Sequence, residues 1–261
     1  MSSQNATPGT RRATARRRND PAQYDDLAGE WWDPRGALAM LHWIAEARAA
    51  LVPPAERSGA VLVDVGCGAG LLGPHLAGKG YRHVGVDVSA SAVTIASRRG
   101  VDVLRGDAAA LPVADQSADV VSAGEILEHV TDLPAAVAEA CRVLRPGGTL
   151  VVDTIAATRL ARILAVTVAE RVPGGAPPGI HDPALFVDRG ELVRHAAEHG
   201  VALELRGLRP RLLAMLAWRL GRRDSVPMIP TWSTAVLFQA VGVKAGGSRR
   251  HGHPPSVEAG T

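Results

Sequence analysis

The stretch DVGCGAG, residues 64–70, decides the fold of this chain. It overlaps the end of an apolar, β-favouring run, AVLVDV at residues 60–65, and it precedes a pattern typical of a helix. Glycines at positions 66, 68 and 70 let the backbone turn sharply and let a ligand approach main-chain atoms. A glycine-rich turn between a strand and a helix predicts a binding loop for a nucleotide-like ligand.

Alternating strand and helix patterns extend this unit along the chain. Helix patterns follow Gly70 and Ser89, with Ser89 as a candidate N-cap, and later ones span residues 133–144 and end at Gly200. This order predicts an α/β fold with a mostly parallel sheet covered by helices. The predicted strands are residues 60–65, 83–87, 101–107, 118–123, 149–154, 202–208 and 234–243.

Asp87 ends the strand that follows the glycine loop, where a carboxylate can accept hydrogen bonds from both hydroxyls of a ribose. Dinucleotide-binding loops have a glycine pattern one residue longer, which seats a pyrophosphate on the helix N-terminus. The third glycine comes earlier here and suits a ligand without that group. The loop and Asp87 alone leave an NAD(P)-dependent oxidoreductase and a methyltransferase open. A plain glycine turn with a solvent-facing Asp87 is the structural alternative.

Composition favours one large domain between two tails. The chain has 261 residues, 46% of them hydrophobic, which suffices for a substantial core. We expect a disordered basic tail at residues 1–23, a folded domain at 24–245 and a second disordered tail at 246–261. His251 and His253 are interpreted as residues of that second tail rather than metal ligands.

Charge and cysteine usage argue against several classes of protein. The formal net charge of +3 is small, so we expect no nucleic-acid partner. Cys67 and Cys141 show neither a disulfide framework nor metal-ligand spacing, which favours a reducing, cytoplasmic compartment. No apolar run approaches the length that crosses a bilayer.

Later motifs narrow the choice of function. GDAAALP places Asp107 at the end of the third predicted strand, where a carboxylate can meet an adenine amino group, and LRPGG precedes the fifth strand. With the glycine loop, these motifs resemble class I S-adenosylmethionine-dependent methyltransferases. Three further stretches are similar to the ubiquinone-biosynthesis O-methyltransferase family: YDDLAGEWWDPRGALAMLHWIAEAR at 24–48, GEILEHV at 124–130 and GIHDPALFVDRGEL at 179–192.

The resemblance implies a Rossmann-like sheet of seven strands, mostly parallel with an antiparallel last strand, and helices on both faces. It also implies that S-adenosylmethionine is the cofactor and that Arg48 pairs with its carboxylate. Without the resemblance, Arg48 would be interpreted as a solvated residue of an amphipathic helix. Trp31 and Trp32 either cover the site or pack the N-terminal helix. The candidate cofactor residues are Arg48, Asp64, Gly66, Gly68, Gly70, Asp87, Asp107 and Gly124.

GEILEHV directly follows the fourth predicted strand, at the carboxyl edge where open α/β sheets bind ligands. Spacings of three and four place Glu125, Glu128 and His129 on one face of a helical turn. The resemblance implies that this set binds a divalent cation, Mg²⁺ by its oxygen ligands or Zn²⁺ by its imidazole. Without a metal, neutral His129 is the candidate general base. In a third alternative, His129 binds no metal and the glutamates only favour a helix start.

We predict an S-adenosylmethionine-dependent O-methyltransferase that acts on a phenolic or catecholic hydroxyl of a small aromatic or prenylated substrate, such as a polyprenylated quinone precursor. Two departures from the family lie near the expected substrate region: Ala156 and Ala157 stand where the family tends to have Asn-Arg, and the loop before His181 is longer. A methyltransferase of a specialised metabolite at oxygen, nitrogen or carbon and a non-catalytic S-adenosylmethionine-binding protein are the alternatives.

Two segments, residues 159–172 and 209–223, carry apolar blocks bounded by arginines. Basic amphipathic helices of this kind lie in anionic lipid headgroups, whereas ordinary lid helices turn their apolar faces inward. The first interpretation predicts a peripheral membrane contact for an otherwise cytoplasmic protein.

Overall fold

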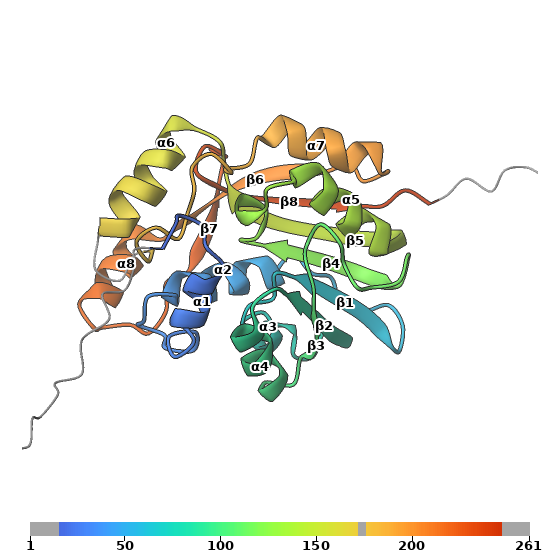
Figure 1. Ribbon diagram of the computed structural model, residues 1–261, viewed down its shortest axis with the longest axis horizontal. Coiled ribbons are helices and arrows are strands. Elements are labelled where there is room, and N and C mark those ends of the chain that lie inside the picture. The colour runs from blue at the N-terminus through green and yellow to red at the C-terminus, as the bar shows by residue number, and fades with distance from the viewer. Residues whose placement is uncertain (1–15, 172–175, 247–261) are drawn as a thin grey trace, which may run out of the picture.

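An eight-stranded sheet runs through the part of the chain that the computed structural model describes, residues 16–171 and 176–246 (Figure 1). The strand order is β3-β2-β1-β4-β5-β8-β6-β7. The first five strands in this order pair parallel with one another, and the β5–β8, β8–β6 and β6–β7 pairs are antiparallel. The strands are β1 (Ala60–Val65), β2 (Tyr81–Asp87), β3 (Asp102–Arg105), β4 (Ala118–Gly124), β5 (Leu144–Ile155), β6 (Glu204–Pro210), β7 (Met228–Thr231) and β8 (Leu237–Val243).

Helices cover both faces of this sheet. Side chains of α5 and α7 pack on one face with Val63 and Val65 of β1, whereas the end of α2 and α3 pack on the other face with Leu62, as alternation along a strand requires. The helices are α1 (Ala22–Asp26), α2 (Ala39–Ala49), α3 (Gly73–Leu76), α4 (Ala90–Arg98), α5 (Leu133–Val143), α6 (Arg159–Ala161), α7 (Arg189–Glu198) and α8 (Leu212–Arg219). A 3₁₀ turn, η1, spans Leu127–His129, and α6 continues as a π-helix, η2 (Arg162–Val168), and a 3₁₀ turn, η3 (Ala169–Arg171).

The predicted α/β fold is confirmed, with an antiparallel end and one strand more than the seven expected. β7 is the additional strand, and it forms the sheet edge by pairing with β6. Its sequence, MIPT, is four residues long and contains a proline, which is tolerated at an edge because an edge strand need not donate from every residue. So short a run shows no readable alternation, so β7 was not among the predicted strands.

Local sequence signals explain where several elements begin. Ser89 is the N-cap of α4, as predicted, and its hydroxyl accepts a hydrogen bond from the backbone N–H of Ala92. Asp132 caps α5 in the same way, through the N–H of Ala135. These caps fix the starts of the two helices that follow β2 and β4, and both lie at the carboxyl edge of the sheet.

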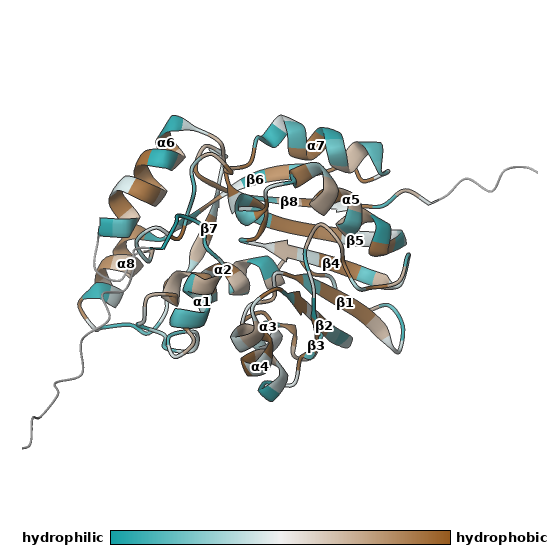
Figure 2. Cartoon of the chain, viewed as in Figure 1, coloured by the Kyte–Doolittle hydropathy of each residue, from teal (hydrophilic) through white to brown (hydrophobic). Residues whose placement is uncertain are grey.

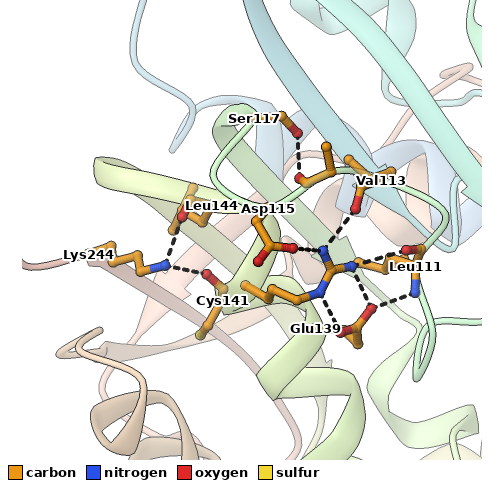
Figure 3. Close-up of polar contacts among 10 residues, drawn as sticks. Leu111, Val113, Asp115, Ser117, Glu139, Cys141, Leu144 and Lys244 are labelled. Carbon is orange, nitrogen blue, oxygen red and sulfur yellow. Dashed lines mark hydrogen bonds and ion pairs between the residues drawn. The ribbon is translucent and has the colours of Figure 1, made fainter.

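Two basic side chains tie the opposite edge together (Figure 3). The guanidinium of Arg142 on α5 donates to both carboxylate oxygens of Glu139, to Asp115 and to the carbonyl oxygens of Leu111 and Val113. These bonds hold the loop between β3 and β4 against α5 where it reaches the amino end of β4. Lys244, after β8, donates to the carbonyl oxygens of Cys141 and Leu144 and fastens the last strand to the end of α5.

The predicted tails are described only in part. Residues 1–15 and most of the predicted C-terminal tail, with His251 and His253, lie outside the described residues. Residues 16–23 are described and contact the domain: Arg18 pairs with Glu170, and the backbone N–H of Asn19 donates to the carbonyl of Gly179. In the described segments, no helix has the length and apolar content that spanning a membrane requires.

Candidate active site

A cavity of about 250 Å³ opens at the carboxyl ends of β1, β2 and β4. The glycine loop contributes Gly66, Cys67 and Gly68 to its wall, and the chain after β4 contributes Gly124 and Glu125. Carboxyl edges of parallel sheets are where α/β folds bind ligands, because the helix N-termini and the flexible connections gather there. The cavity therefore lies where the sequence predicts the cofactor.

The glycine loop requires glycine at two of its positions. Gly66 and Gly68 adopt φ values of +68° and +52°, which glycine tolerates best. A methyl group added at Gly66 would lie 2.6 Å from Ile126, and one at Gly68 would lie 2.6 Å from the ring of Trp31. The absence of a side chain at these positions thus lets Ile126 and Trp31 pack directly against the loop backbone.

Asp87 holds the loop in place and also lines the cavity. Its carboxylate accepts the backbone N–H of Gly68 and that of Ser89, each at 2.8 Å. Burial raises the pKa of Asp87, while these two hydrogen bonds oppose the rise. A carboxylate has about four acceptor positions, so the remaining lone pairs of Asp87 are available to hydroxyl donors in the cavity.

Arg48 reaches the floor of the cavity from α2. Its guanidinium is buried and donates to Asp153 at 2.7 Å, and its Nε has no hydrogen-bond partner. A Cβ at position 124 would lie 1.4 Å from the arginine, so only glycine there admits the guanidinium. Burial opposes a charge on Arg48, yet the carboxylates of Asp153, Asp64 and Glu125 raise its pKa overall.

Two predicted cofactor residues lie outside the cavity wall. Asp64 is buried and faces His83, at 3.3 Å. Gly70 serves packing, because a Cβ there would press on Val101 and Ala96 under α4. The other candidates, namely Arg48, Gly66, Gly68, Asp87, Asp107 and Gly124, all line the cavity.

Of the paired tryptophans, Trp31 lines the cavity and stacks on Tyr24, with 5.6 Å between ring centroids. Trp32 instead packs under the guanidinium of Arg99 and donates its indole N–H to the carbonyl of Ala69. The two predicted roles are therefore divided between the two residues.

GEILEHV does not form the helical turn that its spacing predicts. Glu125 has a φ of +50°, which is uncommon outside glycine, and its N–H donates to the carbonyl of Asp153 on β5. Only a 3₁₀ turn follows, so the three polar side chains do not share one helix face. Strained backbone of this kind gathers at functional sites.

The expected metal ligands point to different partners. Glu128 is fully buried and accepts from the hydroxyl of Thr154 at 2.7 Å. His129 faces Tyr24 and Asn19, and Glu125 lines the cavity. Within residues 16–171 and 176–246, no three His, Cys, Asp or Glu side chains are placed so that they could hold a metal ion. As arranged in the described residues, the acid–acid–histidine set does not converge on a single cation position.

His129 lies in a partly buried pocket beside Tyr24 and His181. Its Nε2 lies 3.2 Å from the Tyr24 hydroxyl, and its ring stacks on that of His181, with 5.5 Å between ring centroids. Burial lowers the pKa of His129 to about 3 and that of His181 to about 4, with the neighbouring His181 adding to the effect on His129. His129 is therefore neutral near pH 7 and presents a lone pair.

A second, smaller cavity adjoins the first. The two share Tyr24, Leu41, Glu125 and His129 as a common wall. Its other lining is largely apolar, from Ala37, Leu38, Met40, Ile44, Ala176, Pro177 and Ile180, with His181 as a polar member. An apolar pocket thus meets the glycine-loop cavity at a neutral histidine.

Sequence reasoning did not assign Asn19 or His181 to the site. Asn19 fell in the predicted basic tail, and its contact with His129 spans 110 positions of the chain. His181 lies in the stretch at residues 179–192 that is similar to the family, but nothing in that stretch indicated a role for it. No local pattern signals such long-range contacts.

Comparisons with known proteins find methyltransferases, as the sequence motifs predict. A family model described as a methyltransferase domain matches residues 63–152. A ubiquinone biosynthesis O-methyltransferase of Thiobacillus denitrificans is 38% identical over 194 residues, covering 70% of this chain and 82% of that protein. One of Ralstonia nicotianae is also 38% identical, over 202 residues, covering 72% of this chain and 84% of that protein.

The fold is also that of solved methyltransferases. A structure from Thermotoga maritima, a possible histamine N-methyltransferase, aligns with a TM-score of 0.59 at 21% identity, covering 85% of this chain and 96% of that one. The fold and the relatives define a class I S-adenosylmethionine-dependent methyltransferase, which resolves the predicted choice against an NAD(P)-dependent oxidoreductase. Within that class, the chain belongs to the ubiquinone biosynthesis O-methyltransferase family.

The carboxylate of Asp87 gives a direct test of the cofactor cavity. Asp87→Asn should weaken S-adenosylmethionine binding about 10- to 100-fold, because hydrogen bonds to a charged acceptor are worth roughly 1.5–3 kcal/mol. Asp102→Asn is the matched control, since Asp102 pairs with Arg82 on the exposed side of β3. Titration calorimetry should show wild-type affinity for that control. If Asp87→Asn and Asp102→Asn bind S-adenosylmethionine with equal affinity, Asp87 does not contact the cofactor.

The pH dependence of the protein's stability tests whether burial raises the pKa of Glu128. Burial raises its pKa to about 7, above the ordinary 4.5, although Thr154 donates to it. The folded state therefore keeps the proton longer than the unfolded state, so this residue lowers stability as pH rises from about 4.5 to about 7. Glu128→Gln should remove that loss and be more stable than wild type by roughly 3 kcal/mol at pH 8 and by much less at pH 5.

Urea unfolding at several pH values measures that difference. A difference independent of pH would show that Glu128 is ionised in the folded protein. Adding Mg²⁺ or Zn²⁺ should raise neither protein's stability, whereas a metal-ligand role predicts stabilisation of the wild type alone.

Proposed function

We propose that this methyltransferase acts on a phenolic or catecholic hydroxyl of a ring that carries an apolar substituent. The observation that carries the proposal is the common wall of the two cavities, where neutral His129 lies between the glycine loop and an apolar pocket. The names of the relatives point to acceptors of the same kind.

The cofactor would occupy the larger cavity. We assign its ribose hydroxyls to Asp87, its adenine amino group to Asp107 and its carboxylate to Arg48, whose buried Nε has no other partner. Gly66, Gly68 and Gly124 line this cavity and, having no side chains, would let the cofactor approach the backbone. When bound, S-adenosylmethionine supplies an electrophilic methyl group on a good leaving system.

The protein's part in the reaction is alignment and proton removal. The apolar wall of the second cavity, with Met40 and Ile44, would orient the ring so that its hydroxyl faces His129. Nε2 of His129 would accept the hydroxyl proton as the oxygen forms its bond to the methyl carbon and the bond from that carbon to sulfur breaks. The imidazolium would form as the sulfonium loses its positive charge, so the net charge of the site would not change during the transfer.

His129→Gln tests this role. The variant should keep S-adenosylmethionine affinity and lose kcat by about 10²- to 10⁴-fold, the usual contribution of a positioned base. Methyl transfer from labelled cofactor to 4-alkyl catechols is the measurement, and kcat/KM should rise up to about fourfold for each methylene that enters the apolar pocket.

Two further arms separate the alternatives. Wild-type enzyme treated with chelator should keep its activity, since the acid–acid–histidine set does not fit a metal ion. Matched 2-aminophenols test nitrogen as the acceptor. Transfer to the amine with none to the catechol, or full activity of His129→Gln, would contradict the proposal.

We further propose that the exposed apolar side chains near α6 and α8 contact an anionic membrane surface. On α8 and just after it, Leu212, Leu213, Leu216 and Leu220 are each more than half exposed. Leu160, Ile163, Leu164 and Val168 are exposed on α6 and η2. Figure 2 shows both helices at the left end of the molecule, with apolar and polar residues interleaved.

Charge complementarity favours lipid as the occupant of this surface. Exposed arginines flank the apolar residues, namely Arg159, Arg162, Arg209, Arg211, Arg219, Arg222 and Arg223. Arginine near an anionic headgroup layer contributes about 1 kcal/mol each, and buried apolar side chains add to it. A surface of this kind would also bring a prenylated acceptor close to the enzyme.

Co-sedimentation with vesicles tests the contact. Wild type should bind vesicles that contain phosphatidylglycerol at low salt and should bind zwitterionic vesicles weakly. Leu213→Asp should reduce binding, whereas Leu104→Asp, at an exposed leucine of β3, is the matched control. Equal binding by both variants, or none by the wild type, would refute a membrane contact through α8.

A further inference from the structure

We propose that Asn19 is a positioning residue that fixes the tautomer of His129, so that residues 16–24 complete the active site. The consequence for catalysis rests on the proposed role of His129 as the base. The side-chain oxygen of Asn19 lies 2.5 Å from Nδ1 of His129, and its amide nitrogen donates to the backbone carbonyl of His129 at 2.9 Å. One side chain therefore contacts both the ring and the backbone of the same residue.

These two contacts settle which ring nitrogen carries the proton. The amide nitrogen of Asn19 can only donate, and the carbonyl of His129 can only accept, so the amide orientation is determined. Its oxygen then faces Nδ1 and can only accept, so neutral His129 must carry its proton on Nδ1. Nε2 is left with the lone pair, and the Tyr24 hydroxyl donates to it at 3.2 Å.

The segment that carries Asn19 is anchored on both sides. Arg18 forms two hydrogen bonds to Glu170, at 2.9 and 2.7 Å, and donates to the carbonyl of His181 at 2.5 Å. On the other side, Asp25 accepts from the hydroxyls of Ser89 and Ser91 at the start of α4. The segment thus crosses the cavity, and Asn19, Pro21 and Tyr24 form part of its wall.

Backbone conformation explains why asparagine suits this position. Asn19 adopts a φ of +58°, in the left-handed region that asparagine, aspartate and glycine tolerate best. Its backbone N–H donates to the carbonyl of Gly179 at 3.0 Å, which holds the turn against the loop before His181. Only asparagine combines this tolerance with one acceptor and one donor at the end of a short side chain.

The geometry also shows where an acceptor hydroxyl would enter. Nε2 lies at the common wall of the two cavities, and the hydroxyl of Tyr24 already donates to it. A phenolic hydroxyl would take the place of Tyr24 at Nε2. Had His129 adopted the other tautomer, Nε2 would carry a proton and could not accept one from the substrate.

Three variants of the full chain isolate this role. Asn19→Gly removes the amide while keeping the left-handed backbone, and Asn19→Asp keeps both the backbone preference and an acceptor for Nδ1. Gln23→Ala is the control, because Gln23 also joins this segment to Gly179 but has no contact with His129. Nitrogen NMR of histidine-labelled protein reports the tautomer, with the His129 signals assigned by their loss in His129→Gln.

We expect the Nδ1-protonated tautomer of His129 in the wild type, in Asn19→Asp and in Gln23→Ala, and a mixture in Asn19→Gly. For methyl transfer, Asn19→Gly should lower kcat about 10- to 100-fold with little change in KM for S-adenosylmethionine, and Asn19→Asp should restore most of it. An unchanged tautomer in Asn19→Gly would overturn the proposal. The NMR signal reports the tautomer of His129 whether or not the enzyme turns over. The activity of His129→Gln tests the role of His129 as base, so failure of that role and failure of the tautomer proposal give different results.

Discussion

The absence of a side chain at Gly124 is the constraint on which the site depends. It lets the guanidinium of Arg48 lie across the end of β4 and pair with Asp153 on β5, so α2 is joined to the centre of the sheet by a buried ion pair. The next residue, Glu125, donates its N–H to the carbonyl of Asp153 and turns with a positive φ. That turn sends the following chain over the cavity, where Glu125, Ile126 and His129 form its wall.

Burial then sets the charge state of this wall. Glu125 and Glu128 have pKa values raised by burial and by neighbouring carboxylates, and His129 has a lowered one. Arg48 with Asp153 is the charged pair at the floor, while the groups nearest the apolar cavity favour their neutral forms. A wall of neutral groups suits an aromatic acceptor, and a methyl transfer needs alignment more than a strong catalytic group.

The fold was largely predictable because its signals are local. The strand at residues 60–65, the cap at Ser89 and the glycine turn each depend on neighbours within a few positions. Contacts between distant segments were not predictable in this way: Asp64 turns to His83, Glu128 turns to Thr154, and Asn19 reaches His129. The spacing of Glu125, Glu128 and His129 predicted one shared face only on the assumption of a helix, and the positive φ of Glu125 removes that assumption.

A crystal structure with S-adenosylhomocysteine and an alkyl catechol bound together tests the central claim most directly. The account predicts the nucleoside along Asp87 and Asp107, the alkyl chain among the apolar side chains of the second cavity, and a catechol oxygen within hydrogen-bond distance of Nε2 of His129 in place of Tyr24. A catechol bound away from the wall shared by the two cavities, with Tyr24 still donating to His129, would contradict it.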